Sequence, residues 1–114
     1  MASGRILVIA PDNDLRRSIA FALEAEGYDV TARAELPSHS WVSAARFDAT
    51  VLDQKALAGP DYVGIAFCVK ARPVILLAAN PRPWLVEWVA EVIEMPVIGN
   101  ALGRAVRTAT HAPA

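Results

Sequence analysis

The sequence predicts an α/β protein built on a doubly wound parallel sheet. Short, continuously apolar runs rich in branched residues alternate along the chain with segments whose apolar residues recur at helical spacing, which is the pattern of parallel strands joined by helices. The loops are short, and right-handed crossovers place helices on both faces of such a sheet. No linker or sequence repeat interrupts the order, so residues 1–114 are expected to form a single domain.

Five apolar runs are expected to form the strands. Asp53 closes the third run, and a carboxylate at the C-terminal tip of a strand lies where open α/β sheets hold their chemistry. The second run is more polar than the others and is expected at a sheet edge. The runs cover residues 5–10, 28–33, 47–53, 73–79 and 96–98.

The segments between the strands carry helix signals. A polar cluster at 11–14 starts the first helix and Gly27 stops it, while residues 40–45 and 61–70 are expected to form the second and third helices. Pro81 and Pro83 prime a fourth helix. Its inner stripe would be Leu85, Trp88, Val89 and Val92, and that of the last helix would be Leu102, Ala105, Val106 and Ala109. Residues 108–114 are expected to fray.

The composition excludes several partner classes. Eleven Lys and Arg residues face twelve Asp and Glu residues, for a net charge of -1, so no strong field attracts nucleic acid or an anionic membrane. The single cysteine, Cys68, has no partner for an internal disulfide, and no apolar stretch resembles a signal peptide or a membrane span. A cytoplasmic location is therefore expected.

The order of elements and four local motifs resemble the receiver domain of bacterial two-component response regulators. The resemblance covers essentially the whole chain. It implies a five-stranded flavodoxin-like (βα)5 fold with strand order 2-1-3-4-5, and it implies that Asp53 is the phosphoacceptor equivalent. The motifs are Arg5–Ile9 followed by Asp14–Arg17, then Ala22–Val30, Phe47–Asp53 and Pro73–Ala79.

The resemblance also implies that most of the phosphotransfer residues are missing. In that family an acidic pair after the first strand holds Mg²⁺, a hydroxyl ends the fourth strand, and a lysine ends the fifth. Here the acidic pair falls on Ala10 and Pro11, the hydroxyl position on Ala78, and the lysine position on Gly99 or Asn100. Because Mg²⁺ requires oxygen ligands in octahedral geometry, no metal or other cofactor is expected.

Two charged residues near Asp53 leave alternatives open. Asp12 either recruits a metal ion through a small loop shift or, as the simpler alternative, caps the first helix. Lys55 lies two residues after Asp53, where its ammonium would hold the carboxylate in a charge-assisted bond. The alternative for Lys55 is a solvated loop lysine.

A possible contact surface follows from the fourth helix. Trp88 is expected inside, which leaves Trp84 near the surface beside Glu87 and Glu91. The resemblance implies dimerisation or docking through helix 4, strand 5 and helix 5, a face that includes Arg104 and Arg107.

The expected function is that of a degenerate receiver-like signalling module that acts by protein–protein interaction. Its partner would be a histidine kinase, another regulator or a second copy. Two alternatives remain: a regulator that a histidine kinase phosphorylates on Asp53 with Mg²⁺, and a flavodoxin-like binder of a small ligand or nucleotide. No acid–base or nucleophile pair can be assembled from the sequence, so an enzyme is not expected.

Overall fold

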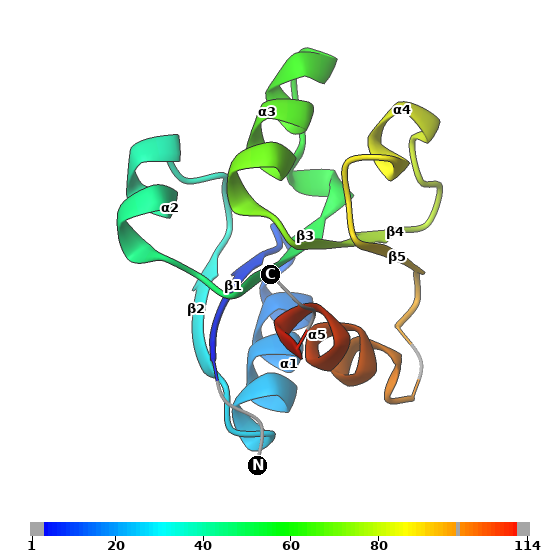
Figure 1. Cartoon of the computed structure of the whole chain (residues 1–114). Helices are drawn as coiled ribbons and strands as arrows, with labels where there is room; N and C mark the ends of the chain where they lie inside the picture. Colours follow the sequence, from blue (N-terminus) through cyan, green and yellow to red (C-terminus); the bar gives the residue numbers. More distant parts are fainter. Residues whose placement is uncertain (1–3, 98, 112–114) are drawn as a thin grey trace.

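The computed structural model describes residues 4–97 and 99–111. Five parallel strands form one sheet in the order β2-β1-β3-β4-β5, which confirms the expected fold class and strand order. Helices α1 and α5 cover one face of the sheet, and α2, α3 and α4 cover the other (Figure 1). The strands are β1 (Arg5–Ile9), β2 (Asp29–Arg33), β3 (Ala49–Asp53), β4 (Val74–Ala78) and β5 (Glu91–Glu94).

The helices begin and end where local signals place them. Asp12 Oδ1 accepts a hydrogen bond from the Leu15 amide at 2.9 Å and caps α1, and Gly27 follows this helix with a left-handed φ of 104°. Ser38 caps α2 in the same way, through the Trp41 amide at 3.2 Å. The helices are α1 (Asn13–Ala25), α2 (His39–Ala45), α3 (Asp61–Ala71), α4 (Pro83–Val86) and α5 (Ala101–His111), and a 3₁₀ turn, η1 (Gln54–Ala56), follows β3.

Alternate residues of the inner strands fill two separate cores. Side chains such as Ile6, Val8 and Val51 pack under α1 and α5. Leu7, Ile9 and their counterparts on β3 and β4 pack under the other three helices. Every residue of β3 and β4 is buried, as expected for strands covered on both faces.

The two edge strands are short and charged. β2 has the exposed residues Asp29 and Arg33, and β5 has the exposed residues Glu91 and Glu94. Charges of this kind discourage pairing with another strand at a free edge. The expected edge position of the second strand is thus confirmed.

The region from the fourth helix to the fifth strand differs from expectation. α4 is a single turn that ends at Val86, and the fifth strand is Glu91–Glu94 in place of residues 96–98. Val92 is half-buried and Ile93 is buried between two exposed glutamates, so the segment is an edge strand and not the end of a helix. Ile98 lies outside the described residues.

The last helix is longer than expected. α5 continues to His111, although fraying was expected from residue 108, and residues 112–114 lie outside the described part. Its predicted inner face is confirmed: Leu102, Ala105 and Val106 are buried, and Ala109 packs against the same core. Arg107 forms an ion pair at 3.1 Å with Glu26, the residue that follows α1, and so links α5 to the end of α1.

Candidate functional site

Asp53 lies at the C-terminal tip of β3, at the centre of the sheet. Its side chain is only 3% exposed. One carboxylate oxygen, Oδ1, accepts a hydrogen bond from the backbone amide of Lys55 at 2.9 Å. The carboxylate therefore caps the 3₁₀ turn that follows the strand and is held in a fixed orientation.

A small hollow of about 220 Å³ opens beside Asp53. The C-terminal ends of β3 and β4 and the segment after β5 form its walls, as expected for a site at the carboxyl edge of a parallel sheet. Its volume is below the roughly 300–1,000 Å³ of typical small-molecule pockets. The lining residues are Asp53, Gln54, Lys55, Ala78, Ala79, Asn80 and Met95.

The described residues that line this hollow include one acid, Asp53, and one base, Lys55. Lys55 is exposed, and it donates a hydrogen bond to Asp53 through its backbone amide. Among residues 4–97 and 99–111, the ion pairs within 4 Å do not include one between Lys55 and Asp53. This geometry agrees with the solvated-lysine alternative.

The segment after β1 does not contribute to the described lining of the hollow. Ala10 is fully buried, and its carbonyl oxygen accepts a hydrogen bond from Arg16 at 2.8 Å. Pro11 and Asp12 are exposed, and the Asp12 carboxylate caps α1, which agrees with the simpler alternative. In the described part of the chain, no group of three His, Cys, Asp or Glu side chains is arranged to hold a metal ion.

The residue that follows the fifth strand is Met95. Because β5 ends at Glu94, the lysine position of the resemblance falls on Met95, which lines the hollow beside Asp53. The expected assignment to Gly99 or Asn100 depended on a strand at 96–98, and the structure places that strand at Glu91–Glu94 instead. Gly99 and Asn100 both line a different cavity between α1 and α5, of about 490 Å³.

Gln54 joins the two loops that border the hollow. Its Nε2 donates to the carbonyl oxygen of Asn80 at 3.0 Å, and its Oε1 accepts from the backbone amide of Arg82 at 2.9 Å. Arg82 donates in turn to the carbonyl of Leu57 at 3.3 Å. This clamp could not be predicted from the sequence, because its partners lie 26 and 28 residues from Gln54 and no local pattern marks them.

The two tryptophans have exchanged the expected positions. Trp84 is half-buried and packs against the core under α3, while Trp88 is 42% exposed. Trp88 follows the short α4, so it does not share the inner helical face that was expected for it. Glu87, Glu91 and Arg104 are exposed, as a contact surface requires.

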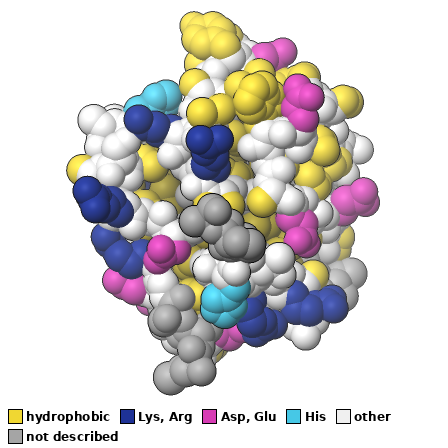
Figure 2. Space-filling model, in the orientation of Figure 1, with side chains coloured by type: hydrophobic (Ala, Val, Ile, Leu, Met, Phe, Trp, Pro, Cys, Tyr) yellow, Lys and Arg dark blue, Asp and Glu magenta, His cyan; other side chains and the backbone are white. Residues whose placement is uncertain are grey.

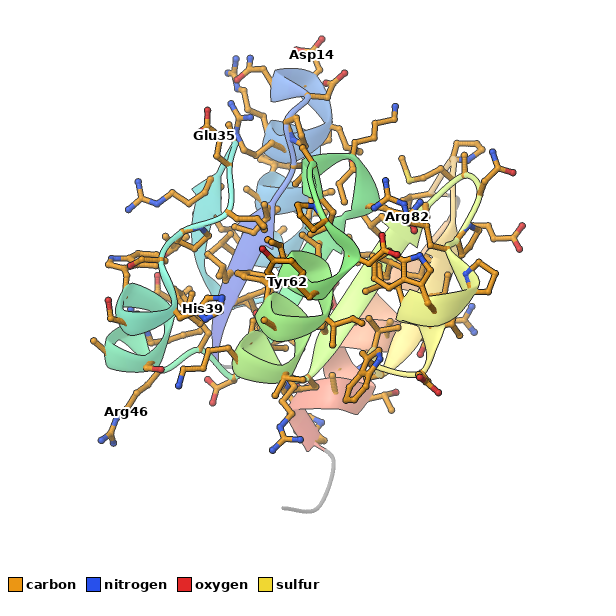
Figure 3. The ribbon with its side chains drawn as sticks, turned by 90° about the horizontal axis from the view of Figure 1, so that it is seen from above. Asp14, Glu35, His39, Arg46, Tyr62 and Arg82 are labelled. Carbon is orange, nitrogen blue, oxygen red and sulfur yellow. The ribbon has the colours of Figure 1, made fainter. Side chains whose placement is uncertain are left out.

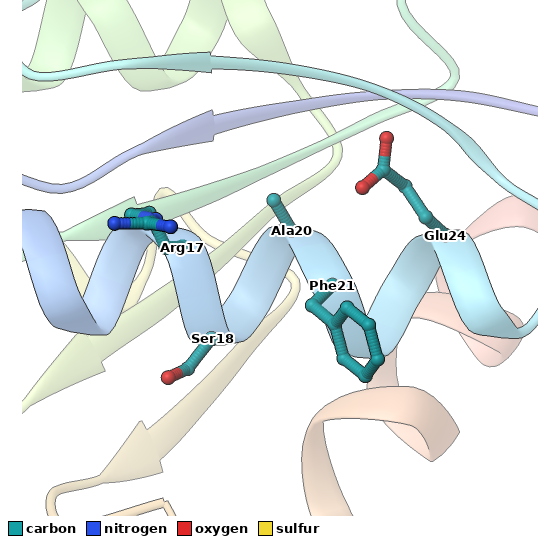
Figure 4. A pocket seen from close by; sticks show the side chains of 5 residues that line it. All are labelled: Arg17, Ser18, Ala20, Phe21 and Glu24. Carbon is teal, nitrogen blue, oxygen red and sulfur yellow. The ribbon is translucent and has the colours of Figure 1, made fainter.

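The other side chains considered for a functional role are a cysteine in the core, a histidine at the start of a helix and an exposed phenylalanine. Cys68 is fully buried, and burial raises the pKa of its thiol to about 11. His39 begins α2 on the surface, just after the capping residue Ser38 (Figure 3). On the outer side of α1, a shallow hollow surrounds Phe21, which is 75% exposed between Arg17 and Glu24 (Figure 4).

Comparisons with known proteins identify the fold. No protein-family model matches the sequence, and no curated protein is significantly similar to it. Among solved structures, the chemotaxis response regulator CheY4 of Vibrio cholerae superposes with a TM-score of 0.73 at 16% identity, over 95% of this chain and 99% of that one. This chain has the receiver fold.

Other receiver structures agree. The non-phosphorylated HemR receiver domain from Leptospira biflexa has a TM-score of 0.73 at 21% identity, with 96% of each chain covered. A two-component response regulator from Clostridium difficile has a TM-score of 0.71 at 16% identity, covering 95% of this chain and 96% of that one. In this chain, the residues at the C-terminal ends of β1, β3, β4 and β5 include Ala10, Pro11, Asp53, Ala78 and Met95.

The helices among the described residues are too short or too polar to cross a membrane.

Proposed function

We propose that this protein is a degenerate receiver-like signalling module that acts by binding other proteins, without Mg²⁺-dependent phosphorylation of Asp53. The supporting observation is the set of side chains around that carboxylate. Among the described residues that line its hollow, Asp53 is the sole acid, and Ala78 and Met95 offer neither a hydroxyl nor a cation. The module has no catalytic residues of its own in this proposal.

The physical reason lies in the charge that develops during phosphoryl transfer. Catalysis of this step depends on cations and hydrogen-bond donors placed around the transferred oxygens. Mg²⁺ is usually held by one or two carboxylates together with the phosphate oxygens. Ala10 and Pro11 supply no side-chain oxygen after β1, and Asp12 is committed to capping α1.

The partners follow from the same proposal. A histidine kinase, another regulator or a second copy would bind through surface contacts that include Trp88, Glu87 and Glu91. The α4, β5 and α5 face remains a prediction for such contacts. A cytoplasmic location belongs to the proposal too, and the free, buried Cys68 is in keeping with a reducing compartment.

Labelling with a small phosphodonor tests this proposal. The protein is incubated with acetyl phosphate, with and without Mg²⁺, and its mass is measured. We expect no Mg²⁺-dependent mass increase in the wild type or in Asp53→Asn. The double variant Pro11→Asp with Met95→Lys returns an acid and a cation to the site, and it should label more than the wild type.

Stoichiometric labelling of the wild type that requires both Mg²⁺ and Asp53 would contradict the proposal and favour a phosphorylatable regulator. For the binding part, Trp88→Ala is compared with the wild type in capture of proteins from the native cell. Loss of a captured protein in Trp88→Ala, with Asp53→Asn unchanged, is the expected result.

A further inference from the structure

The outer surface of α3 is apolar where a surface helix normally carries polar residues. The inner side of α3 packs on the sheet through Gly64, Phe67, Cys68 and Ala71. A helix covered on one side normally turns a polar face to the solvent. Here the opposite side presents Tyr62, Ala66 and Val69, so α3 is apolar on both sides.

These three residues form one stripe. They are spaced four and three residues apart, which places them on the same face of a helix. Tyr62 is 71% exposed and Val69 is 41% exposed. In the view from above, Tyr62 lies on the outer side of α3, away from the sheet (Figure 3).

Two further exposed apolar residues lie on or just after α4, which covers the same face of the sheet as α3 (Figure 1). Val86 is 43% exposed and Trp88 is 42% exposed. The ring of Trp84 packs beneath α3, with Cη2 3.5 Å from the place where a Cβ on Gly64 would stand. Figure 2 shows hydrophobic side chains gathered over this upper part of the molecule. We call the set Tyr62, Ala66, Val69, Val86 and Trp88 the α3–α4 face.

From the α3–α4 face we infer that the protein self-associates, with a second copy packing its α3 antiparallel across a two-fold axis near Ala66. This inference rests on the proposed function, because it names the partner in protein binding. It places the contact on α3, beside the predicted face of α4, β5 and α5.

The shape of the stripe suits an isologous pair. A two-fold contact brings the same patch of both copies together. The small Ala66 at the middle lets two helices approach closely, and Tyr62 of each copy then lies near Val69 of the other. The stripe has bulky residues at its two ends and a small residue between them, so it fits against the same stripe of a second copy whose α3 runs in the opposite direction.

The charges around the stripe favour the same arrangement. Asp61 lies at the N-terminal end of α3 and Lys70 lies near its C-terminal end, and both are exposed. An antiparallel copy brings each acidic end beside a basic end, whereas a parallel copy would bring like charges together. A partner with a strong charge of one sign would be attracted by one of these two residues and repelled by the other.

The exposed area is in the range that a weak dimer needs. Scaled by their exposed fractions, the four large side chains of the face leave roughly 350 Å² of apolar surface open to water. Patches of about 300–600 Å² are the largest on typical monomers and often functional. Two such faces together hold roughly 700 Å² of apolar surface, which is below the roughly 1,200 Å² at which stable specific interfaces begin and suits a weak, reversible dimer.

Sedimentation velocity over a series of concentrations tests the inference. We expect the sedimentation coefficient of the wild type to rise with concentration toward the dimer value. Ala66→Glu should remain monomeric, because it places two like charges at the two-fold axis. Glutamate is a good helix former at an exposed position, and circular dichroism will show that this variant is folded.

A mixture of two variants with opposite charges at position 66 provides the decisive test. An equimolar mixture of Ala66→Glu and Ala66→Lys should associate again, whereas each variant alone should not. Phe21→Ser removes an equally exposed aromatic residue from α1 on the other side of the sheet, and Arg104→Glu changes the α5 surface. Both of these controls should associate like the wild type.

A wild type that stays monomeric at the highest concentration, or an Ala66→Glu variant that still dimerises, would overturn the inference. Loss of association in Arg104→Glu but not in Ala66→Glu would assign the dimer to α4, β5 and α5 instead. None of these outcomes changes the phosphodonor result, so failure of the dimer and failure of the proposed function are distinguishable.

Discussion

The Gln54 clamp is expected to hold the loop between β4 and α4 in place over the Asp53 hollow. Replacing Gln54 with alanine removes two hydrogen bonds, at 3.0 Å to the Asn80 carbonyl and 2.9 Å from the Arg82 amide. A net hydrogen bond stabilises a protein by roughly 0.5–1.5 kcal/mol. Asn80 is exposed, so water replaces part of the loss, and we expect a total cost of about 1–2 kcal/mol.

Two measurements check this value. The melting temperature should fall by roughly 4–8 °C for a domain of this size. Amide hydrogen exchange should accelerate locally at Arg82, because its N–H loses the Gln54 Oε1 acceptor. Gln54→Glu is the matched control, since it keeps an acceptor for Arg82 while it replaces the donor to Asn80 with a charged carboxylate oxygen. Its Arg82 amide should therefore stay protected.

An unchanged melting temperature together with unchanged exchange at Arg82 in Gln54→Ala would refute the clamp. Accelerated exchange over the whole molecule, with none specific to Arg82, would show a global loss of stability in place of a local release. The comparison of Gln54→Ala with Gln54→Glu separates these two effects.

Two further predictions concern the core. The folded-state pKa of Cys68, about 11, is above its ordinary value of 9.0, so the protonated thiol contributes stability that is complete below pH 9.0 and is lost as the pH rises toward 11. The difference in stability between wild type and Cys68→Ala should therefore shrink between pH 9.0 and 11. Rapid thiol modification of the native protein at neutral pH would contradict this prediction. Leu85→Ala should lower the free energy of unfolding by roughly 2–5 kcal/mol, because Leu85 is fully buried and anchors α4; Val86→Ala, on the exposed side of the same turn, should cost about 0.5 kcal/mol or less in urea denaturation.

The sequence was sufficient for the first four strands and for the helices between them. Their apolar runs are long, and their boundaries carry caps such as Asp12 and Ser38. These signals are local, and the structure places each of these elements within two residues of the expected bounds.

The region after β4 could not be predicted in the same way. Leu85, Trp88, Val89 and Val92 recur at helical spacing, yet the helix stops after one turn and Val92 belongs to a strand. Short apolar segments fit either period, and only packing against β4 decides between them. The exchanged tryptophans follow from this one error, and the expected lysine position at Gly99 or Asn100 depended on it as well.

The candidate site was predicted only in part. Asp53 was placed correctly because a strand's end is a local feature, and Ala78 lines the same hollow as expected. Met95 and the Gln54 clamp were missed because each depends on segments that are distant in sequence. A hydrogen bond between such segments leaves no periodic pattern in either one.

The charged edge strands have a consequence for how this protein behaves when it is concentrated. Asp29 and Arg33 are exposed on one edge strand of the sheet, and Glu91 and Glu94 are exposed on the other. Backbone pairing from one molecule to the next would have to bring these charges together, so endless fibrous growth is disfavoured. A crowded solution should therefore contain closed, countable assemblies.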